Sequence, residues 1–182
     1  MRSYNSPANP PSSPIDVERI TAAEYLDAAA KAERNGDDKP ALRRILTELE
    51  RFPNIRQRLA FEMLPMFLRS LKAGTEPPHY LVSFVTLSAN SIDLQRLPEF
   101  AAGLEKIILQ FFDLAGARPA ARQPSTLTIL SSALTLHQVD KERFVSVFAE
   151  LKRRCGAAEN DPRREFITHI EWVMTEAQKK SP

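Results

Sequence analysis

The sequence predicts an all-α fold of stacked helical hairpins. Three observations favour it: glycines follow the apolar runs, helix-start signals precede them, and apolar residues within them recur three and four positions apart. Together they indicate about eight antiparallel helices, arranged either as an α-solenoid or as an irregular bundle. We expect these helices near residues 21–35, 38–52, 54–73, 78–91, 97–114, 124–138, 140–155 and 161–179.

The first 15 residues differ in composition from the rest of the chain. They contain four prolines, four serines, one arginine and no acidic residue. Such a segment can neither bury enough apolar surface to fold nor propagate a helix. We therefore expect an extended Pro/Ser-rich tail over 1–15, either a plain disordered terminus or an arm that orders on a partner. A single helical domain should follow over 16–182.

Start signals precede the expected helices. Thr21 and Glu24 have the spacing of a capping box, in which each side chain bonds the backbone of the other residue. Asn54 and Gln57 have the same spacing in amide form. Aspartates stand ahead of three further helices and predict side-chain caps there: Asp37 and Asp38 before Pro40, Asp140, and Asp161 before Pro162.

Glycines mark the expected helix ends. Four of the five follow apolar runs, in the position where a left-handed residue often ends a helix: Gly36, Gly74, Gly116 and Gly156. Gly103 instead lies inside the fifth predicted helix, where glycine costs about 1 kcal/mol relative to alanine. We expect a neighbouring helix to approach closely at this point.

The spacing of the apolar residues predicts helices that bury one face. The clearest runs are Ile45, Leu49 and Phe52, then Ile55, Leu59, Met63, Met66 and Phe67, and then Phe144, Val147, Phe148 and Leu151. Pro65 lies inside the third predicted helix and should kink it. Trp172, on the last predicted helix, is expected in the core rather than as an interface anchor.

Two uncharged segments, 79–92 and 125–139, are predicted to be central helices covered on most sides. Residues 80–87 also suit a buried strand, but no second strand-like run is present to pair with it, which favours a helix. Residues 77–92 contain Ser, Thr and Asn and are fewer than the ~20 apolar residues that span a bilayer. The sequence therefore predicts no membrane span.

An offset of 47 residues superposes similar residues of the two uncharged segments and the helices that follow them. It pairs Leu87 with Leu134, Ile92 with Val139, Asp93 with Asp140, Arg96 with Arg143, Leu97 with Phe144 and Leu104 with Leu151. Repeat proteins built from two- or three-helix units have periods of about 40–47 residues. The offset is either such a repeat or a coincidence between two segments.

The same segments carry a resemblance to known families. Residues 81–93 and 127–144, within the span 79–155, resemble the helical repeats of FASTK-type, RAP-type and octotricopeptide proteins of mitochondria and plastids. The resemblance implies binding of organellar RNA or a place in an organellar ribonucleoprotein. The C-terminal part of the chain does not resemble a RAP domain.

The sequence offers no recognisable catalytic site. His79, His137 and His169 are far apart, and Glu165 with His169 reads as a surface pair because no second pair of metal ligands accompanies it. No phosphate-binding loop, glycine-rich fingerprint or paired-cysteine motif occurs. We therefore predict no enzyme, no cofactor, no metal site and no small-molecule substrate.

Cys155 is the only cysteine, which excludes an intrachain disulfide and favours a reducing intracellular compartment. It follows three cations that could activate its thiol or could merely complement the end of a helix; we expect an inert thiol. Given the resemblance, the expected compartment is the mitochondrion.

The net charge of +2 is too small to indicate nucleic-acid binding through bulk electrostatics, but cations concentrate in two places. Arginine favours phosphate recognition, whereas the interleaved glutamates favour salt-bridged, solvated faces. The predicted nucleic-acid-binding residues are Arg43, Arg44, Arg51, Arg56 and Arg58 in the first group and Lys152, Arg153 and Arg154 in the second.

These observations predict a non-catalytic helical-repeat binding or scaffold protein. The expected role is an RNA-associated subunit of a mitochondrial ribonucleoprotein, with protein partners in a larger assembly and RNA contacts through the Arg-rich helices. The alternative is a protein-binding adaptor such as a secreted bacterial effector, which would have a similar Ser/Pro-rich N-terminus. An enzyme with an unrecognised site is a third hypothesis.

Overall fold

The computed structural model describes residues 16–117, 126–155, 161 and 163–179. Across these residues the secondary structure is helical, without a strand, so the expected all-α fold is confirmed. The α-helices are α1 (Ala22–Arg34), α2 (Lys39–Arg51), α3 (Pro53–Ala73), α4 (His79–Leu87), α5 (Leu97–Ala117), α6 (Thr126–Val139), α7 (Lys141–Arg154) and α8 (Arg163–Lys179). Two short 3-10 helices precede α2 and follow α4: η1 (Gly36–Asp38) and η2 (Ala89–Ser91).

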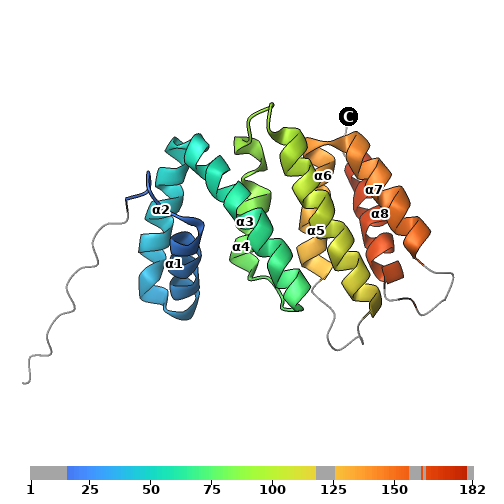
Figure 1. Ribbon diagram of the computed structural model, residues 1–182, viewed down its shortest axis with the longest axis horizontal. Helices are drawn as coiled ribbons and strands as arrows, with labels where there is room; N and C mark the ends of the chain where they lie inside the picture. The colour runs from blue at the N-terminus through green and yellow to red at the C-terminus, as the bar shows by residue number, and fades with distance from the viewer. Residues whose placement is uncertain (1–15, 118–125, 156–160, 162, 180–182) are drawn as a thin grey trace, which may run out of the picture.

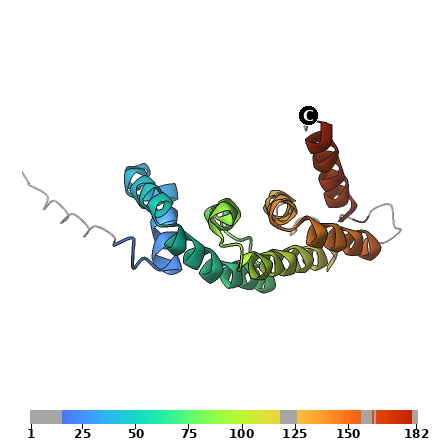
Figure 2. The same ribbon diagram turned by 90° about the horizontal axis from the view of Figure 1, so that it is seen from above.

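The helices form two rows that follow a shallow arc (Figures 1 and 2). The row of α1, α3, α5 and α7 lies on the outer side of the arc, and the row of α2, α4, α6 and α8 lies on the inner side (Figure 2). Along the outer row α1 contacts α3, α3 contacts α5 and α5 contacts α7, while along the inner row α4 contacts α6 and α6 contacts α8. The N-terminal and C-terminal helices therefore lie at opposite ends of the array.

Local capping explains where several helices begin. At α1 the Thr21 N–H donates to Glu24 Oε2 (2.8 Å) and the Glu24 N–H donates to Thr21 Oγ1 (3.2 Å), which confirms the capping box. At α7 the Arg143 N–H donates to Asp140 Oδ1 (2.9 Å), and before α8 the Arg163 N–H donates to Asp161 Oδ1 (3.0 Å). The two aspartate caps were thus predicted correctly.

The amide capping box expected at Asn54 and Gln57 is wrong. α3 begins one residue earlier, at Pro53, because proline already has the φ of a first helical residue and needs no N–H partner there. Gln57 is buried instead: its Nε2 donates to Asp93 Oδ2 (2.8 Å), and its Oε1 accepts from the Asp93 N–H (2.6 Å). The side chain therefore joins α3 to the segment that precedes α5.

Two of the glycine stops and one aspartate cap also need correction. Gly74 ends α3 with φ 76°, as expected, and is the residue with positive φ in the described part of the chain. α1 instead ends at Arg34 and is followed by Asn35 in an extended conformation, so that Gly36 opens η1, and Gly116 lies within α5. Asp38 precedes α2 without making a side-chain cap bond. Gly156 lies outside the described residues.

The predicted apolar stripes form one core between the two rows. Leu59, Met63 and Phe67 of α3 are fully buried, as are Phe100 and Phe112 of α5. The core expectation for Trp172 is wrong, since its side chain is 62% exposed. α8 buries Ile170, and a residue two positions further lies about 200° around a helix axis, on the opposite face. α3 continues as one helix through Pro65, and the kink there stays a prediction.

The two uncharged segments are helices, as expected, and both lie in the inner row (Figure 2). α6 packs against α4, α5, α7 and α8, while α4 packs against α1, α3 and α6. α4 is less covered than the sequence predicted, because His79, Ser83 and Leu87 form an exposed stripe at a spacing of four. α4 is also shorter than expected and passes into η2, where the Ser88 hydroxyl donates to the Phe84 carbonyl (2.6 Å).

The helices that the 47-residue offset pairs occupy corresponding places in the two rows. α4 and α6 share the inner row, α5 and α7 share the outer row, and Leu104 and Leu151 are both fully buried. Leu87 is 65% exposed, however, whereas its counterpart Leu134 is half-buried. A common origin of the two hairpins stays a prediction.

Gly103 lies where α3 and α5 approach each other closely, as the sequence predicted. A Cβ atom at this position would lie 2.8 Å from Leu64 Cδ1, well inside van der Waals contact. Leu64 is buried, so its side chain has little room to move away. The glycine therefore sets the spacing between two neighbours in the outer row.

We predict that substitutions at Gly103 and Leu64 are coupled. Gly103→Val should lower the free energy of unfolding by about 1–3 kcal/mol, because it overpacks this contact. In a Leu64→Ala background the space opens, and Gly103→Ala should then raise stability by about 1 kcal/mol through its helix propensity. Urea denaturation followed by circular dichroism measures both effects. Equal stabilisation by Gly103→Ala in both backgrounds would contradict the close approach.

Candidate nucleic-acid interface

The structure separates the two groups of cations that the sequence proposed as a nucleic-acid interface. α2 and the start of α3 lie at one end of the array, and the C-terminal end of α7 lies towards the other end (Figure 1). Arg43, Arg44, Arg51, Arg56 and Arg58 belong to the first group, and Lys152, Arg153 and Arg154 to the second. The two groups therefore do not form one continuous surface.

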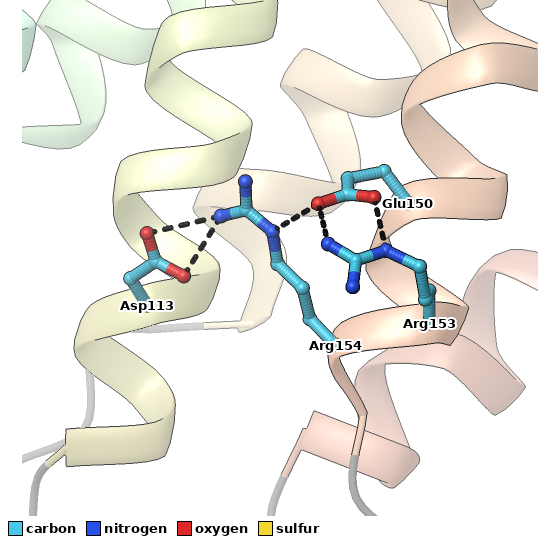
Figure 3. Close-up of polar contacts among 4 residues, drawn as sticks. All are labelled: Asp113, Glu150, Arg153 and Arg154. Atoms are coloured by element: carbon cyan, nitrogen blue, oxygen red, sulfur yellow. Dashed lines mark hydrogen bonds and ion pairs between the residues drawn. The ribbon is translucent and has the colours of Figure 1, made fainter.

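The α7 cations are held by carboxylates (Figure 3). Arg153 donates through Nε and Nη2 to the two oxygens of Glu150, both at 2.7 Å, and Arg154 Nε donates to the same carboxylate at 2.7 Å. Arg154 Nη1 also reaches Asp113 on α5, at 3.1 Å and 3.2 Å from its oxygens. Hydrogen bonds from Arg153 and then Arg154 lower the pKa of Glu150 to about 2.

Lys152 is engaged as well. Its ammonium pairs with Glu171 on α8 and lies 4.8 Å from the centre of the Phe148 ring. The α7 group therefore ties α7 to α5 and α8. A nucleic acid would have to displace three carboxylates to contact these cations.

Arg56, on α3, holds the end of α4. Its Nη2 donates to the Leu87 carbonyl (3.1 Å) and its Nε donates to the Ser88 hydroxyl (3.3 Å). A cation at the C-terminal end of a helix is favoured because carbonyls there lack partners within the helix. The position explains Arg56 without a ligand.

Arg58 holds the start of α1 against α3. Its Nη2 donates to the Ile20 carbonyl (2.6 Å), while Glu62, one turn further along α3, accepts from the Ala22 N–H (3.1 Å). The Arg58 Nε and a Glu62 oxygen are 3.8 Å apart. Arg58 and Glu62 therefore bond a backbone carbonyl and a backbone N–H of the segment that leads into α1, those of Ile20 and Ala22.

The arginines of α2 differ from these five cations. Arg43, Arg44 and Arg51 are exposed, and among the described residues no ion pair or hydrogen bond joins their side chains to another group. Glu48 and Glu50 share the helix but likewise form no ion pair in this part of the chain. α2 therefore presents guanidinium groups that no other described residue binds.

These arginines are exposed because α2 buries its opposite face. Ile45 and Leu49 are buried, whereas Arg44 and Arg51, seven residues apart, lie almost one above the other on the exposed side. Residues 39–73, which contain α2 and α3, have eight Lys or Arg and three Glu, a net charge of +5 compared with +2 for the whole chain. The positive charge is therefore concentrated on α2 and α3 and not over this whole end of the array, because residues 16–38 contain seven Asp or Glu and three Lys or Arg.

His137 and His169 each contact a neighbouring group of the fold. Burial, with Lys141 nearby, lowers the pKa of His137, whose ring packs edge-on against Phe144 at 5.1 Å. The imidazole of His169 lies 3.0 Å from the backbone oxygen of Glu165 rather than beside its carboxylate. No group of three or more metal-ligating side chains occurs among the described residues.

An open pocket of about 300 Å³ lies between the end of α7 and α8. It is lined by Lys152, Cys155, Arg164, Ile167, Thr168 and Glu171. The thiol thus lies beside charged groups, as the sequence indicated, but Lys152 and Glu171 neutralise each other across the pocket.

Among the helices that the structure describes, none combines the length and apolar character that crossing a membrane requires.

We predict that Arg58 and Arg44 differ in their effect on stability. Arg58→Gln should lower the free energy of unfolding by about 1–2 kcal/mol, because it removes a charged donor from the Ile20 carbonyl. Arg44→Gln removes the same charge from an exposed side chain that has no partner among the described residues, and should change stability by less than about 0.5 kcal/mol. Thermal unfolding of the two variants makes the comparison, and equal losses would contradict the assigned roles.

The Glu150 network should produce a pH-dependent difference in stability. Because the folded-state pKa of Glu150, about 2, lies below its ordinary value of 4.5, its contribution is present above pH 4.5 and is lost as the pH falls towards 2. Glu150→Gln should therefore melt below the wild type at pH 6, with a difference that disappears near pH 2. A constant difference in melting temperature across this range would exclude the ionised network as its cause.

No protein-family model matches this chain, and neither does any curated protein or any solved structure. The family resemblance expected for residues 79–155 therefore stays a prediction. What the protein does is inferred from its own residues.

Proposed function

We propose that the protein is a non-catalytic helical scaffold that binds RNA through the exposed arginines of α2, as a subunit of a mitochondrial ribonucleoprotein. The observation that carries this proposal is that Arg43, Arg44 and Arg51 are exposed and without an ion-pair partner in the described structure, whereas carboxylates hold Lys152, Arg153 and Arg154 of α7. Arg56 and Arg58 bond backbone carbonyls of the protein and therefore do not belong to the proposed contact surface.

Arginine suits this role chemically. Its planar guanidinium carries five donors and stays charged, and it pairs with phosphate through two hydrogen bonds at once. Each phosphate that it neutralises releases condensed counterions, so affinity falls as salt increases. Because α2 packs on the array through its apolar face only, phosphates can approach its other side without disturbing the core.

A protein-binding adaptor, such as a secreted bacterial effector, is the second candidate. The exposed stripe of His79, Ser83 and Leu87 on α4, a helix of the inner row, favours it. Trp172, exposed on α8, is a residue type that often anchors protein interfaces. The same surfaces could hold protein partners of a ribonucleoprotein, so RNA binding is what separates the two candidates.

The test is the salt dependence of RNA binding by an Arg44→Gln, Arg51→Gln variant. If three arginines contact phosphates of a duplex stem, affinity for a labelled RNA hairpin should fall about 40-fold between about 0.05 M and 0.2 M salt. With one arginine left, binding should be weaker and the fall should be about 3-fold. Fluorescence anisotropy titrations at several salt concentrations measure both slopes.

The matched control is Lys152→Gln with Arg153→Gln, which removes the same charge at the α7 end. It should leave the salt slope unchanged. If the wild type does not bind the hairpin, or if only the α7 variant loses affinity, the proposed contact on α2 is wrong and the adaptor becomes the leading candidate.

A further inference from the structure

The exposed side of α2 groups its arginines around one hydroxyl. Thr47 is exposed and follows Arg43 by four residues and Arg44 by three, and Arg51 follows Thr47 by four. Residues three and four apart are neighbours on a helix surface, about 5–6 Å between Cβ atoms. The side thus carries three guanidinium groups and a hydroxyl, all of them donors that suit phosphate oxygens.

The three arginines of α2 extend over a length that corresponds to several phosphates of a nucleic acid. Arg43 and Arg51 are eight residues apart, which corresponds to about 12 Å along a helix axis. A double helix carries about one phosphate charge per 1.7 Å of its axis, roughly seven over this length, and a single strand carries about half as many. A duplex therefore presents a higher density of phosphate charge to the same three guanidinium groups.

The rigidity of α2 also favours a double helix as the ligand. Ile45 and Leu49 are buried, so the backbone that carries the arginines is held in place. A duplex is already rigid, whereas a single strand loses conformational freedom when it is held against a rigid surface. Proteins that bind single strands offset this loss by stacking bases on aromatic side chains. The exposed residues of α2 besides the arginines are Lys39, Pro40, Ala41, Leu46, Thr47 and Glu50, and none of them is an aromatic side chain on which a base could stack.

From this geometry, and resting on the proposed function, we infer that the RNA on α2 is double-helical and that α2 contacts its backbone without reading its sequence. Contacts to phosphates carry no sequence information, because the backbone is the same at every base pair. The partner chemistry is thus a base-paired stem of a larger RNA. Thr47 lies at the centre of the contact.

The experiment compares one RNA sequence in two states. The full-length protein is titrated into a labelled RNA strand, alone and annealed to its complement, at about 0.1 M salt. A second duplex of unrelated sequence is the control for base readout. We expect the duplex to bind at least about tenfold more tightly than the single strand, and the two duplexes to bind within about twofold of each other.

Substitution at the centre of the surface provides a second measurement. Thr47→Glu places a negative charge among the three arginines and should weaken duplex binding about tenfold, and Thr47→Val, which keeps the shape, should weaken it by less than about threefold. Circular dichroism of both variants checks that the helix content is unchanged.

The outcomes separate this inference from the proposal on which it rests. If the single strand binds as tightly as the duplex, or if the two duplexes differ by tenfold, the inference is wrong while RNA binding stands. If neither form of RNA binds, the proposed function fails as well. If duplex binding survives Thr47→Glu unchanged, the contact lies elsewhere on the protein.

Discussion

One turn at the start of α3 holds three other segments in place. Arg56 binds the end of α4, Gln57 bonds the residue that leads into the α5 segment, and Arg58 binds the backbone that leads into α1. These contacts surround the buried stripe of α3, where Leu59 and Met63 are completely enclosed. Because the three side chains are consecutive, a displacement of this turn would disturb α1, α4 and α5 together. The relative positions of the N-terminal helices depend on it.

Most helix boundaries could be predicted because they depend on local physics. Thr21 with Glu24, Asp140 and Gly74 each act within one turn of their own position, so a single sequence contains the necessary information. The prediction at Asn54 failed because a second local signal, proline at the first helical position, begins α3 earlier. Trp172 failed for a different reason, since the buried face of α8 is determined by the helices against which it packs.

The candidate site could be predicted only in part. The pairing of Glu150 with Arg153 and Arg154 follows from a spacing of three and four, and this information is present in the sequence. The contact of Arg154 with Asp113, 41 residues away, and that of Arg56 with Leu87, 31 residues away, exist only after the helices have packed. Sequence reasoning therefore located the cations but could not separate those that serve the fold from those on α2.

The order of helices in the two rows also affects how the chain can fold. Within the described residues, the main contacts between helices join α-helices that are at most three apart in the chain, such as α1 with α4 and α5 with α8. No element near one terminus has to find one near the other, so only short and intermediate loops are closed and little chain entropy is lost in closing each. Proteins with such local contacts fold rapidly. A hairpin at any point of the array could therefore nucleate the structure, and its neighbours could then add to it on either side.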